Sequence, residues 1–314
     1  MIDGNPDALR VRTCCPCCES TAYRVIAREP YGGAGLKRLL DEHYGGRANH
    51  AAIAKFDYEL VRCTSCGLGY QRTVPASDLL NEIYEQWIVP AGEKDRLYRS
   101  RELSYYRYLA EQLQFVIQHL KRKPSTVRAL DFGMGWAEWA TMAKAFGCQI
   151  SGMELSADRV TNAQSIGIEV VQWEDLATRK FDFINTEQVF EHLIDPLPTL
   201  RHLANALDGS GLIRVSVPDA RASMRALAKR RDFAALSSQQ VMSIAPLEHV
   251  NCFDYRSLVA LGKFAGLRPV RPGLRHLYNS SSGWFELRNA LRLILRPIYR
   301  HIFPKSTVVY FCRQ

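Results

Sequence analysis

Six of the nine cysteines in this 314-residue chain fall into two tight groups. Residues 14–18 read CCPCC, and residues 63–66 read CTSC and are followed by a glycine. A C-x-x-C turn offers two thiolates from one loop, and two such turns complete the tetrahedron that a structural zinc ion prefers. The second group therefore predicts Cys63 and Cys66 as zinc ligands. A disulfide pair and an iron–sulfur cluster are the alternatives.

The register of the first cysteine group is ambiguous, because Cys15 with Cys18 and Cys14 with Cys17 both have ligand spacing. We favour Cys15 and Cys18, since Pro16 directly after the first ligand suits a tight turn. A closed four-thiolate site leaves no coordination position open, so such a metal organises the fold and performs no chemistry.

A second candidate site is the glycine-rich stretch from Asp131 to Ala137, with the sequence DFGMGWA. It follows a predicted strand and opens a predicted helix, which is where a parallel sheet binds nucleotides. Glu154 lies 21 residues beyond Gly133 and ends the next predicted strand, a place from which a carboxylate binds ribose hydroxyls. An NAD site uses the same loop but is disfavoured, because Trp136 crowds the helix start where a pyrophosphate would bind.

The elements that position this loop alternate between strands and helices. The pattern predicts strands over 127–132, 149–153, 169–172, 181–185 and 212–217, helices over 136–146 and 156–165, and a further helix beginning at Asp195-Pro196. Earlier helices are predicted near 79–88 and 102–121. Such alternation indicates an α/β fold with a doubly wound, Rossmann-like sheet, preceded by a small zinc-binding module and a helical linker.

The motifs of this sheet resemble those of class I S-adenosylmethionine-dependent methyltransferases. The matching segments are LDFGMG at 130–135, MELS at 153–156, FDFI at 181–184, FEHLIDP at 190–196 and GSGLI at 209–213. With the cysteine groups and EHVNCF at 248–253, the chain is similar to bacterial methyltransferases that have an N-terminal zinc-binding domain, several of which act on nucleotide-linked sugars. It departs from the pattern at Ala137, where a third glycine is common, and at 189–192, which lacks the tyrosine of sugar C-methylating relatives.

The resemblance implies a set of S-adenosylmethionine contacts. Gly133 and Gly135 would pack against the methionine portion, Asp131 would face its amino group through the loop, and Glu154 would hold the ribose. Glu174 or Asp175 would meet the adenine amino group, and the indole of Trp173 could cover the adenine ring.

Methyl transfer to a hydroxyl or a carbon needs a base to remove a proton. His192 follows the fourth predicted strand and His249 follows the fifth, and histidine titrates near neutral pH. We favour His192 as the base, with His249 as base or substrate ligand and with Glu191 and Glu248 as orienting partners. The alternative for each histidine is a loop residue bonded to the backbone.

These predictions divide the chain into four parts: a zinc-binding module over 12–75, a helical linker or lid over 76–125, the methyltransferase domain over 126–270, and a tail over 271–314. Residues 220–245, basic at 229–231, could cover an anionic acceptor such as a diphosphate, or present a solvated helix face. In the tail, arginines recur every four residues between 288 and 300. We expect a basic amphipathic helix over 283–303, which either contacts an anionic membrane surface or packs on the domain before a last strand over 307–312.

The charge of +9 is concentrated in the tail, where residues 268–305 carry eight basic side chains and one acid. That distribution disfavours a broad nucleic-acid-binding face, so RNA methylation is the weaker alternative, as is a non-catalytic zinc scaffold that keeps the nucleotide fold. We expect a methyltransferase for a sugar, glycan or similar small molecule, with O-methylation slightly favoured over C-methylation. No run is apolar enough for a membrane span or signal peptide, which predicts a cytoplasmic protein. The oligomeric state is not indicated.

Overall fold

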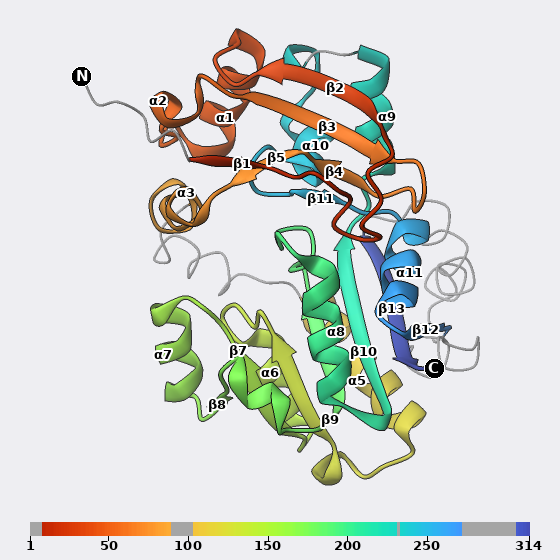
Figure 1. Cartoon of the computed structure of the whole chain (residues 1–314). Helices are drawn as coiled ribbons and strands as arrows, with labels where there is room; N and C mark the ends of the chain where they lie inside the picture. Colours follow the sequence, from red (N-terminus) through yellow and green to blue (C-terminus); the bar gives the residue numbers. More distant parts are fainter. Residues whose placement is uncertain (1–7, 89–102, 231–232, 272–305) are drawn as a thin grey trace, which may run out of the picture. The chain divides into compact units, whose positions relative to one another are not determined.

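The computed structural model describes residues 8–88, 103–230, 233–271 and 306–314 (Figure 1). They form two compact units, and the chain passes between these units more than once. The first unit takes in the described part of Met1–Arg99 together with Phe190–Leu197 and Pro218–Leu261. The second takes in the described parts of Ser100–Val189, Pro198–Val217 and Gly262–Gln314. Two segments that follow residue 126 in the sequence thus belong to the first unit.

The first unit is built on a four-stranded antiparallel sheet in the order β11-β4-β3-β2. Its strands are β2 (Tyr23–Pro30), β3 (Asp57–Cys63), β4 (Gly69–Gln71) and β11 (Asn251–Cys252). A two-stranded sheet pairs β1 (Leu9–Val11) with β5 (Thr73–Pro75). The edge strand β11 comes from the far end of the chain, so the module predicted over 12–75 is completed by residues near 250.

The segment between β2 and β3 contains two helices. Helix α1 (Ala34–Tyr44) ends at Gly45, which takes the left-handed conformation (φ +60°) and donates its N–H to the carbonyl of Asp41. Glycine adopts this conformation without the steric cost that other residues meet. The short α2 (His50–Ile53) follows, and after β5 come α3 (Ser77–Glu82) and a π turn, η1 (Ile83–Trp87).

Residues 220–245 add a helical layer to the first unit. They form α9 (Arg221–Arg230), η4 (Phe233–Ala235), α10 (Ser238–Val241) and η5 (Met242–Ile244). Helix α9 approaches β4 closely, since a Cβ at Gly69 would lie 2.3 Å from the sulfur of Met224. Glycine at this position therefore lets the helix and the sheet share one core, in which Met224 and Leu227 are buried.

The second unit contains a seven-stranded sheet in the order β12-β13-β10-β9-β6-β7-β8. Its strands are β6 (Arg128–Phe132), β7 (Gln149–Met153), β8 (Glu169–Val170), β9 (Phe181–Glu187), β10 (Leu207–Pro218), β12 (Leu267–Val270) and β13 (Ser306–Arg313). Strands β6 to β10 pair in parallel, and β12 pairs with β13 antiparallel. The predicted doubly wound α/β sheet is confirmed.

Four helices were predicted: α5 (Leu103–Leu120), which precedes β6, and α6 (Glu138–Ala145), α7 (Ala157–Ser165) and α8 (Pro196–Ala206), which alternate with the strands. Three further elements were not predicted: η2 (Pro124–Thr126), η3 (Glu174–Ala177) and α11 (Tyr255–Phe264). Helix α5 buries Leu109 and Leu113 in one cluster with Ala129 of β6 and Phe183 of β9. The chain leaves β6 toward β7 on one side, whereas β9 lies on the other side. Open parallel sheets bind ligands where the strand order reverses, which here is the carboxyl end of β6, directly before the glycine-rich loop.

One predicted strand starts earlier than expected. Strand β10 begins at Leu207 and not at residue 212, so Gly209 and Gly211 lie within it. Its register with β9 shifts between Leu207 and Leu212. The last strand, predicted over 307–312, is present as β13. The basic helix predicted over 283–303 lies outside the described residues. Within the described parts of the chain, every helix is too short or too polar to span a membrane.

Candidate functional site

The first unit brings together the four cysteines expected to bind zinc. The sulfurs of Cys15, Cys18, Cys63 and Cys66 all lie within 4.8 Å of one another. The Cys15 and Cys66 sulfurs are 3.6 Å apart, and the Cys18 and Cys63 sulfurs are 3.5 Å apart. The second turn closes because Gly67, in the left-handed conformation (φ +81°), donates its N–H to the carbonyl of Cys63.

This spacing fits a metal site. A zinc ion about 2.3 Å from four sulfurs sets sulfur–sulfur distances of about 3.8 Å, whereas a disulfide sets about 2.05 Å. The observed distances are close to the first value. Cys15 and Cys18 therefore face the second pair, while Cys17 is buried with its sulfur 4.0 Å from the carbonyl of Ser257, and Cys14 is half-buried. All the ligand atoms are thiols, the soft donors that zinc accepts.

The glycine-rich loop in the second unit is held against the end of β7. The N–H groups of Gly133 and Met134 both donate to the carbonyl of Met153, at 2.9 and 3.1 Å. Gly133 has φ +70°, and a Cβ there would lie 2.6 Å from a methyl group of Val189. Gly135 has φ +56° with open space where a Cβ would point. The loop thus leaves a backbone surface that a ligand can approach closely.

Ala137 takes the place of the third glycine and still adopts the left-handed conformation, at φ +61°. It precedes the first residue of α6, and its side chain is fully buried among Met134, Ala140 and Ala163. The loop therefore keeps its shape without the glycine, at the cost that an L-residue pays in this region of backbone space.

Glu154 faces the loop from the end of β7. One carboxylate oxygen accepts a hydrogen bond from the Gly135 N–H at 2.9 Å, and the other accepts from the N–H groups of Leu155 and Ser156 at 2.9 and 3.1 Å. The guanidinium of Arg159 is 3.6 Å away. The carboxylate is thereby fixed beside the open face of Gly135, which suits the predicted role on a ribose.

Asp131 lies beneath the loop in a buried polar network. Its carboxylate accepts from the Asn185 amide at 2.8 Å, and Asn185 in turn accepts from Arg214 at 2.9 Å. Arg214 is fully buried, pairs with Glu187 and donates to the Tyr108 hydroxyl at 2.8 Å. Burial raises the pKa of Asp131 to about 7, although the bond from Asn185 opposes the shift.

The residues expected near an adenine follow the ends of β7 and β8. Asp175 accepts from the Gln172 N–H at 2.8 Å and so caps the turn that begins at Glu174. Trp173 is 40% exposed and stacks on His202 with ring centroids 4.2 Å apart. Leu155, which the sequence analysis did not single out, is 99% exposed directly after Glu154.

The two predicted histidines meet in the first unit. The rings of His192 and His249 have centroids 4.8 Å apart, and the side chains of both lie within 4.8 Å of the Glu191 carboxylate. This donor set would also suit a divalent cation. Glu248 contributes in two ways: its carbonyl bonds the His192 Nδ1 at 3.0 Å, and its carboxylate accepts from His43 at 2.6 Å.

The electrostatics of this cluster keep both imidazoles neutral. Burial lowers the pKa of His192, and Glu248 opposes the shift. Burial also lowers the pKa of His249 to about 4, with the nearby His192 adding to the effect. For Glu248, burial raises the pKa, but the hydrogen bond from His43 and the neighbouring imidazoles outweigh it and lower the pKa to about 2. The cluster therefore combines the ionised carboxylate of Glu248 with imidazoles that can accept a proton.

Two residues that the sequence analysis did not single out join the histidine segments. Asn251 donates to the carbonyls of Phe190 and Leu193 at 2.8 and 2.6 Å. Arg12 donates to the carbonyl of Ile194 at 2.6 Å and to the Asn251 side chain at 3.0 Å. Asn251 lies two residues after His249, which was a usable signal, whereas nothing in the sequence marked Arg12.

The predicted site residues thus form three groups. Two of the groups lie in the first unit: the four zinc ligands form one, and Glu191, His192, Glu248 and His249 form the other. The glycine loop, Asp131 and Glu154 gather in the second unit, with Glu174 and Asp175 after the neighbouring strand β8.

Comparison with known proteins identifies one family. A protein-family model described as "Methyltransferase domain" matches residues 99–271, which is more than half of the chain. Among curated proteins, no sequence matches.

Several solved structures are similar to this chain at low sequence identity. The plantazolicin methyltransferase BpumL in complex with SAH is 14% identical, with a TM-score of 0.48 over 75% of this chain and 94% of that one. PKMT2 from Rickettsia typhi in complex with AdoHcy is 15% identical, with a TM-score of 0.42 over 64% and 53%. DesVI from Streptomyces venezuelae is 19% identical, with a TM-score of 0.35 over 40% and 57%. No TM-score here reaches 0.5, so these likenesses establish nothing by themselves.

Proposed function

Because this chain belongs to the methyltransferase-domain family and is a class I S-adenosylmethionine-dependent methyltransferase, we propose that it methylates a hydroxyl group of a sugar or a similar small polar metabolite. The sugar would be linked to a nucleotide or a lipid. Oxygen is favoured over carbon as the acceptor atom, since residues 189–192 lack the tyrosine of C-methylating relatives.

The observation that carries this proposal is the hydrogen bond between His192 and the carbonyl of Glu248. A carbonyl can only accept, so Nδ1 of His192 holds the proton and Nε2 of the neutral ring holds a lone pair. That Nε2 lies 3.8 Å from a carboxylate oxygen of Glu191. A proton taken from a hydroxyl would therefore arrive beside a negative charge that stabilises the imidazolium. His249 would then bind the acceptor or share the proton.

The second unit offers the residues that would hold the cofactor. Bound S-adenosylmethionine supplies a methyl group on a positively charged sulfur. Gly133 and Gly135 would admit its methionine portion, which the open space at Gly135 supports, and Glu154 would accept from the ribose hydroxyls. Asp131 would act on the amino group through the loop. Glu174 or Asp175 would accept from the adenine amino group.

We also propose that zinc binds Cys15, Cys18, Cys63 and Cys66 in a structural role. The support is the four-thiol cluster, whose sulfur spacing fits a tetrahedron. The ligands lie before β2 and at the end of β3, and these two places are neighbours because Tyr23 pairs with Cys63. Zinc would therefore fix this end of the hairpin, with no coordination position left for a substrate.

A labelled-methyl assay tests the proposed function. Full-length protein is incubated with methyl-labelled S-adenosylmethionine and separate panels of nucleotide-linked sugars, lipid-linked sugars and RNA, and the products are identified by mass spectrometry and NMR. We expect a new methoxy group on a sugar. Label found only in RNA, or a new carbon–carbon bond, would contradict the proposal.

Two variants connect that assay to His192. His192→Ala should lower turnover by about 100-fold or more, the range of general-base catalysis, while the cofactor dissociation constant stays unchanged. His50→Ala is the matched control, because His50 is an imidazole of the same unit that pairs with Asp41. Full turnover in His192→Ala would remove this residue from the mechanism.

A further inference from the structure

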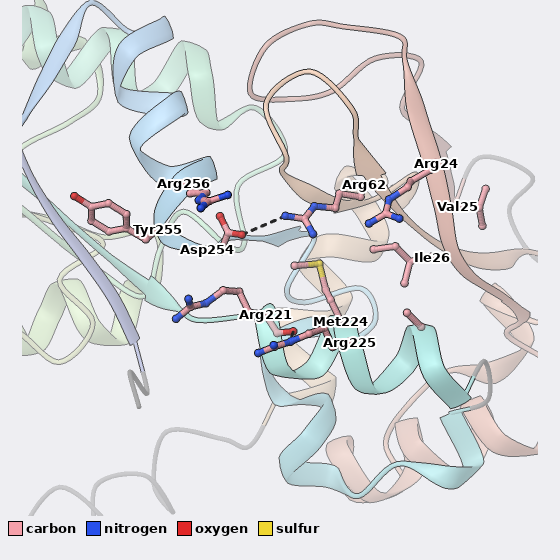
Figure 2. A pocket seen from close by; sticks show the side chains of 11 residues that line it. Arg24, Val25, Ile26, Arg62, Arg221, Met224, Arg225, Asp254, Tyr255 and Arg256 are labelled. Carbon is pink, nitrogen blue, oxygen red and sulfur yellow. Dashed lines mark hydrogen bonds and ion pairs between the residues drawn. The ribbon is translucent and has the colours of Figure 1, made fainter. Parts of the chain in front are cut away.

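A cavity of about 480 Å³ in the first unit has a strongly basic lining (Figure 2). Of the described residues, five arginines and a single carboxylate, Asp254, line it. The arginines come from four elements: Arg24 from β2, Arg62 from β3, Arg221 and Arg225 from α9, and Arg256 from the start of α11. No part of the site described above includes these residues.

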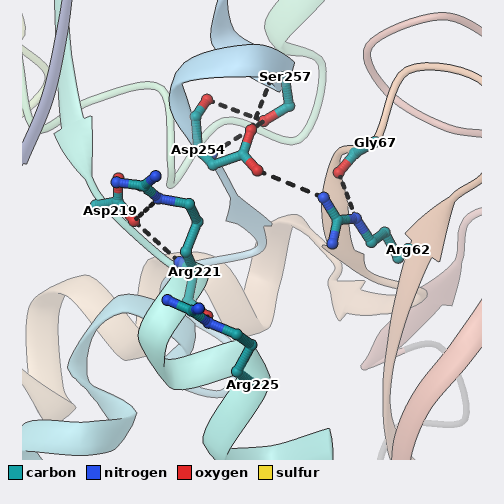
Figure 3. A network of polar contacts seen from close by, with 7 residues as sticks. All are labelled: Arg62, Gly67, Asp219, Arg221, Arg225, Asp254 and Ser257. Atoms are coloured by element: carbon teal, nitrogen blue, oxygen red, sulfur yellow. Dashed lines mark hydrogen bonds and ion pairs between the residues drawn. The ribbon is translucent and has the colours of Figure 1, made fainter.

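Two of the arginines already have carboxylate partners (Figure 3). Arg62 lies 3.5 Å from Asp254 and donates to the carbonyl of Gly67 at 3.1 Å. Arg221 donates to Asp219 at 2.9 Å. These pairs hold the wall of the cavity in place and leave little of their charge uncompensated.

The other three arginines have no ion pair within the described parts of the chain. Arg24, Arg225 and Arg256 are all exposed. The Arg225 guanidinium donates to the backbone carbonyl of Arg221 at 3.2 Å. Arg221 lies one turn earlier on the same face of α9, so this bond holds the Arg225 side chain along that face. Three guanidinium groups without ion-pair partners around one cavity repel one another, so this arrangement does not stabilise the fold. A bound anion would offset this repulsion, because it accepts charge-assisted hydrogen bonds from the guanidinium groups.

The two acids near the cavity are used locally and do not neutralise it. Asp219 accepts from the N–H of Arg221, the first residue of α9, at 3.1 Å. Asp254 accepts from the N–H and hydroxyl of Ser257 at 2.8 and 3.0 Å, at the start of α11. Each acid thereby caps a helix and pairs with one arginine. The net charge that faces the cavity is therefore about three positive charges.

One part of the lining is apolar. Val25 is 52% exposed and Tyr255 is 38% exposed, and Figure 2 shows these two residues on opposite sides of the arginines, with Met224 between them. Exposed apolar groups beside guanidiniums favour a ligand that has an organic ring as well as a charged group.

We infer that this cavity binds the diphosphate group of a small molecule of the nucleoside diphosphate class. A diphosphate carries two to three negative charges and several acceptor oxygens, which match three unpaired guanidiniums with their planar arrays of donors. The volume lies in the range of small-molecule sites. Tyr255 on one side of the arginines, or Val25 on the other, would contact the organic part. The inference concerns binding alone and stands whether or not this ligand is the methyl acceptor.

Calorimetric titration of the full-length protein, without S-adenosylmethionine, tests the inference. The probes are inorganic phosphate, inorganic pyrophosphate, uridine diphosphate and adenosine diphosphate. We expect the diphosphates to bind at least about tenfold more tightly than phosphate, and to weaken as salt is raised. Arg225→Ala and Arg256→Ala should each weaken diphosphate binding about tenfold. Both side chains are exposed, so their removal should leave the melting temperature unchanged.

Arg28→Ala is the matched control. Arg28 lies on the same strand as Arg24 and is exposed, but it pairs with Asp57 and does not line the cavity, so its loss changes the net charge equally. Diphosphate binding that is absent at millimolar concentration, or that falls equally in Arg28→Ala and Arg225→Ala, would overturn the inference. Equal affinity for pyrophosphate and both nucleotides would overturn the part that assigns Tyr255 or Val25 to an organic group.

Discussion

The Nδ1 atom of His192 is committed to the carbonyl of Glu248, so a proton gained in the reaction must bind Nε2. Burial lowers the pKa of His192 and so favours the neutral ring, whereas Glu248 favours the charged ring. The Glu191 carboxylate lies 3.8 Å from Nε2, where the proton would arrive. These opposing effects give the imidazole an intermediate basicity, which is what proton transfer near neutral pH requires.

Activity should begin to decrease at a lower pH than it would if the base were a histidine with the usual pKa. The pKa of His192 lies below its usual value of 6.5, and that of His249 is about 4. A base works only when unprotonated, so kcat/KM should stay level as the pH falls to about 6.5 and decrease only below it. A pH profile of kcat/KM measures this. A decrease centred at or above pH 6.5 would show that neither imidazole is the base.

The same pKa values have a consequence for stability. The pKa of His249 is lower in the folded protein than in the unfolded chain, so between pH 6.5 and 4 the unfolded state binds the extra proton. The contribution of this residue is fully present above pH 6.5 and is lost as the pH falls toward 4. Urea titrations at pH 7.5 and 5 should show that His249→Phe narrows the difference in unfolding free energy. An unchanged difference would place the acid sensitivity elsewhere.

A variant of Leu155 tests the cofactor site without affecting the stability of the fold. Its side chain is 99% exposed, so Leu155→Ala removes no buried contact and should not change the melting temperature. If the adenine covers this residue, the variant should bind S-adenosylmethionine about threefold to tenfold more weakly, as calorimetry would show. Ile166→Ala, on the same unit and 41% exposed, is the control and should bind normally. Equal affinity in both variants would remove Leu155 from the site.

At the scale of elements, α5 ends in a conformation that its sequence does not favour. Lys121 follows the last helical residue with φ +52°, and it is exposed. Glycine takes this position at the end of α1, where Gly45 has the same conformation. Lys121→Gly should therefore raise the unfolding free energy by about 0.5–1 kcal/mol, whereas Lys121→Ala should leave it nearly unchanged. Urea denaturation measures both. A loss of stability in the glycine variant would contradict this account.

The sequence predicted the local elements well and their distant partners poorly. Strand β7 has the predicted bounds, 149–153, because Gly147 at the end of the preceding helix and Glu154 mark its two limits in the sequence. Strand β11 has only two residues and carries no pattern of its own, so its pairing with β4 was not visible. That pairing explains how the segment of His249 reaches the zinc-binding module. The role of Arg12 was hidden for the same reason, since its partners lie some 180 to 240 residues away.

Zinc should stabilise the first unit as a whole. The proposed ligands join the loop before β2 to the turn between β3 and β4, so Cys63→Ser should lose the metal and weaken the entire sheet. Elemental analysis should find one zinc ion per chain in the wild type and none in the variant. Chelation should lower the melting temperature by about 10 °C or more, given the binding energies of structural zinc. A stable, active, metal-free protein would contradict the proposal.

The interleaving of the two units sets the order in which a nascent chain can fold. Strands β2, β3 and β4 leave the ribosome early, but β11 follows only after nearly the whole central sheet of the other unit has been made. Until then β4 has an unpaired edge, which invites pairing with other chains. Translation that stops before residue 251 would leave that edge permanently open. Full-length synthesis is therefore itself a safeguard against aggregation.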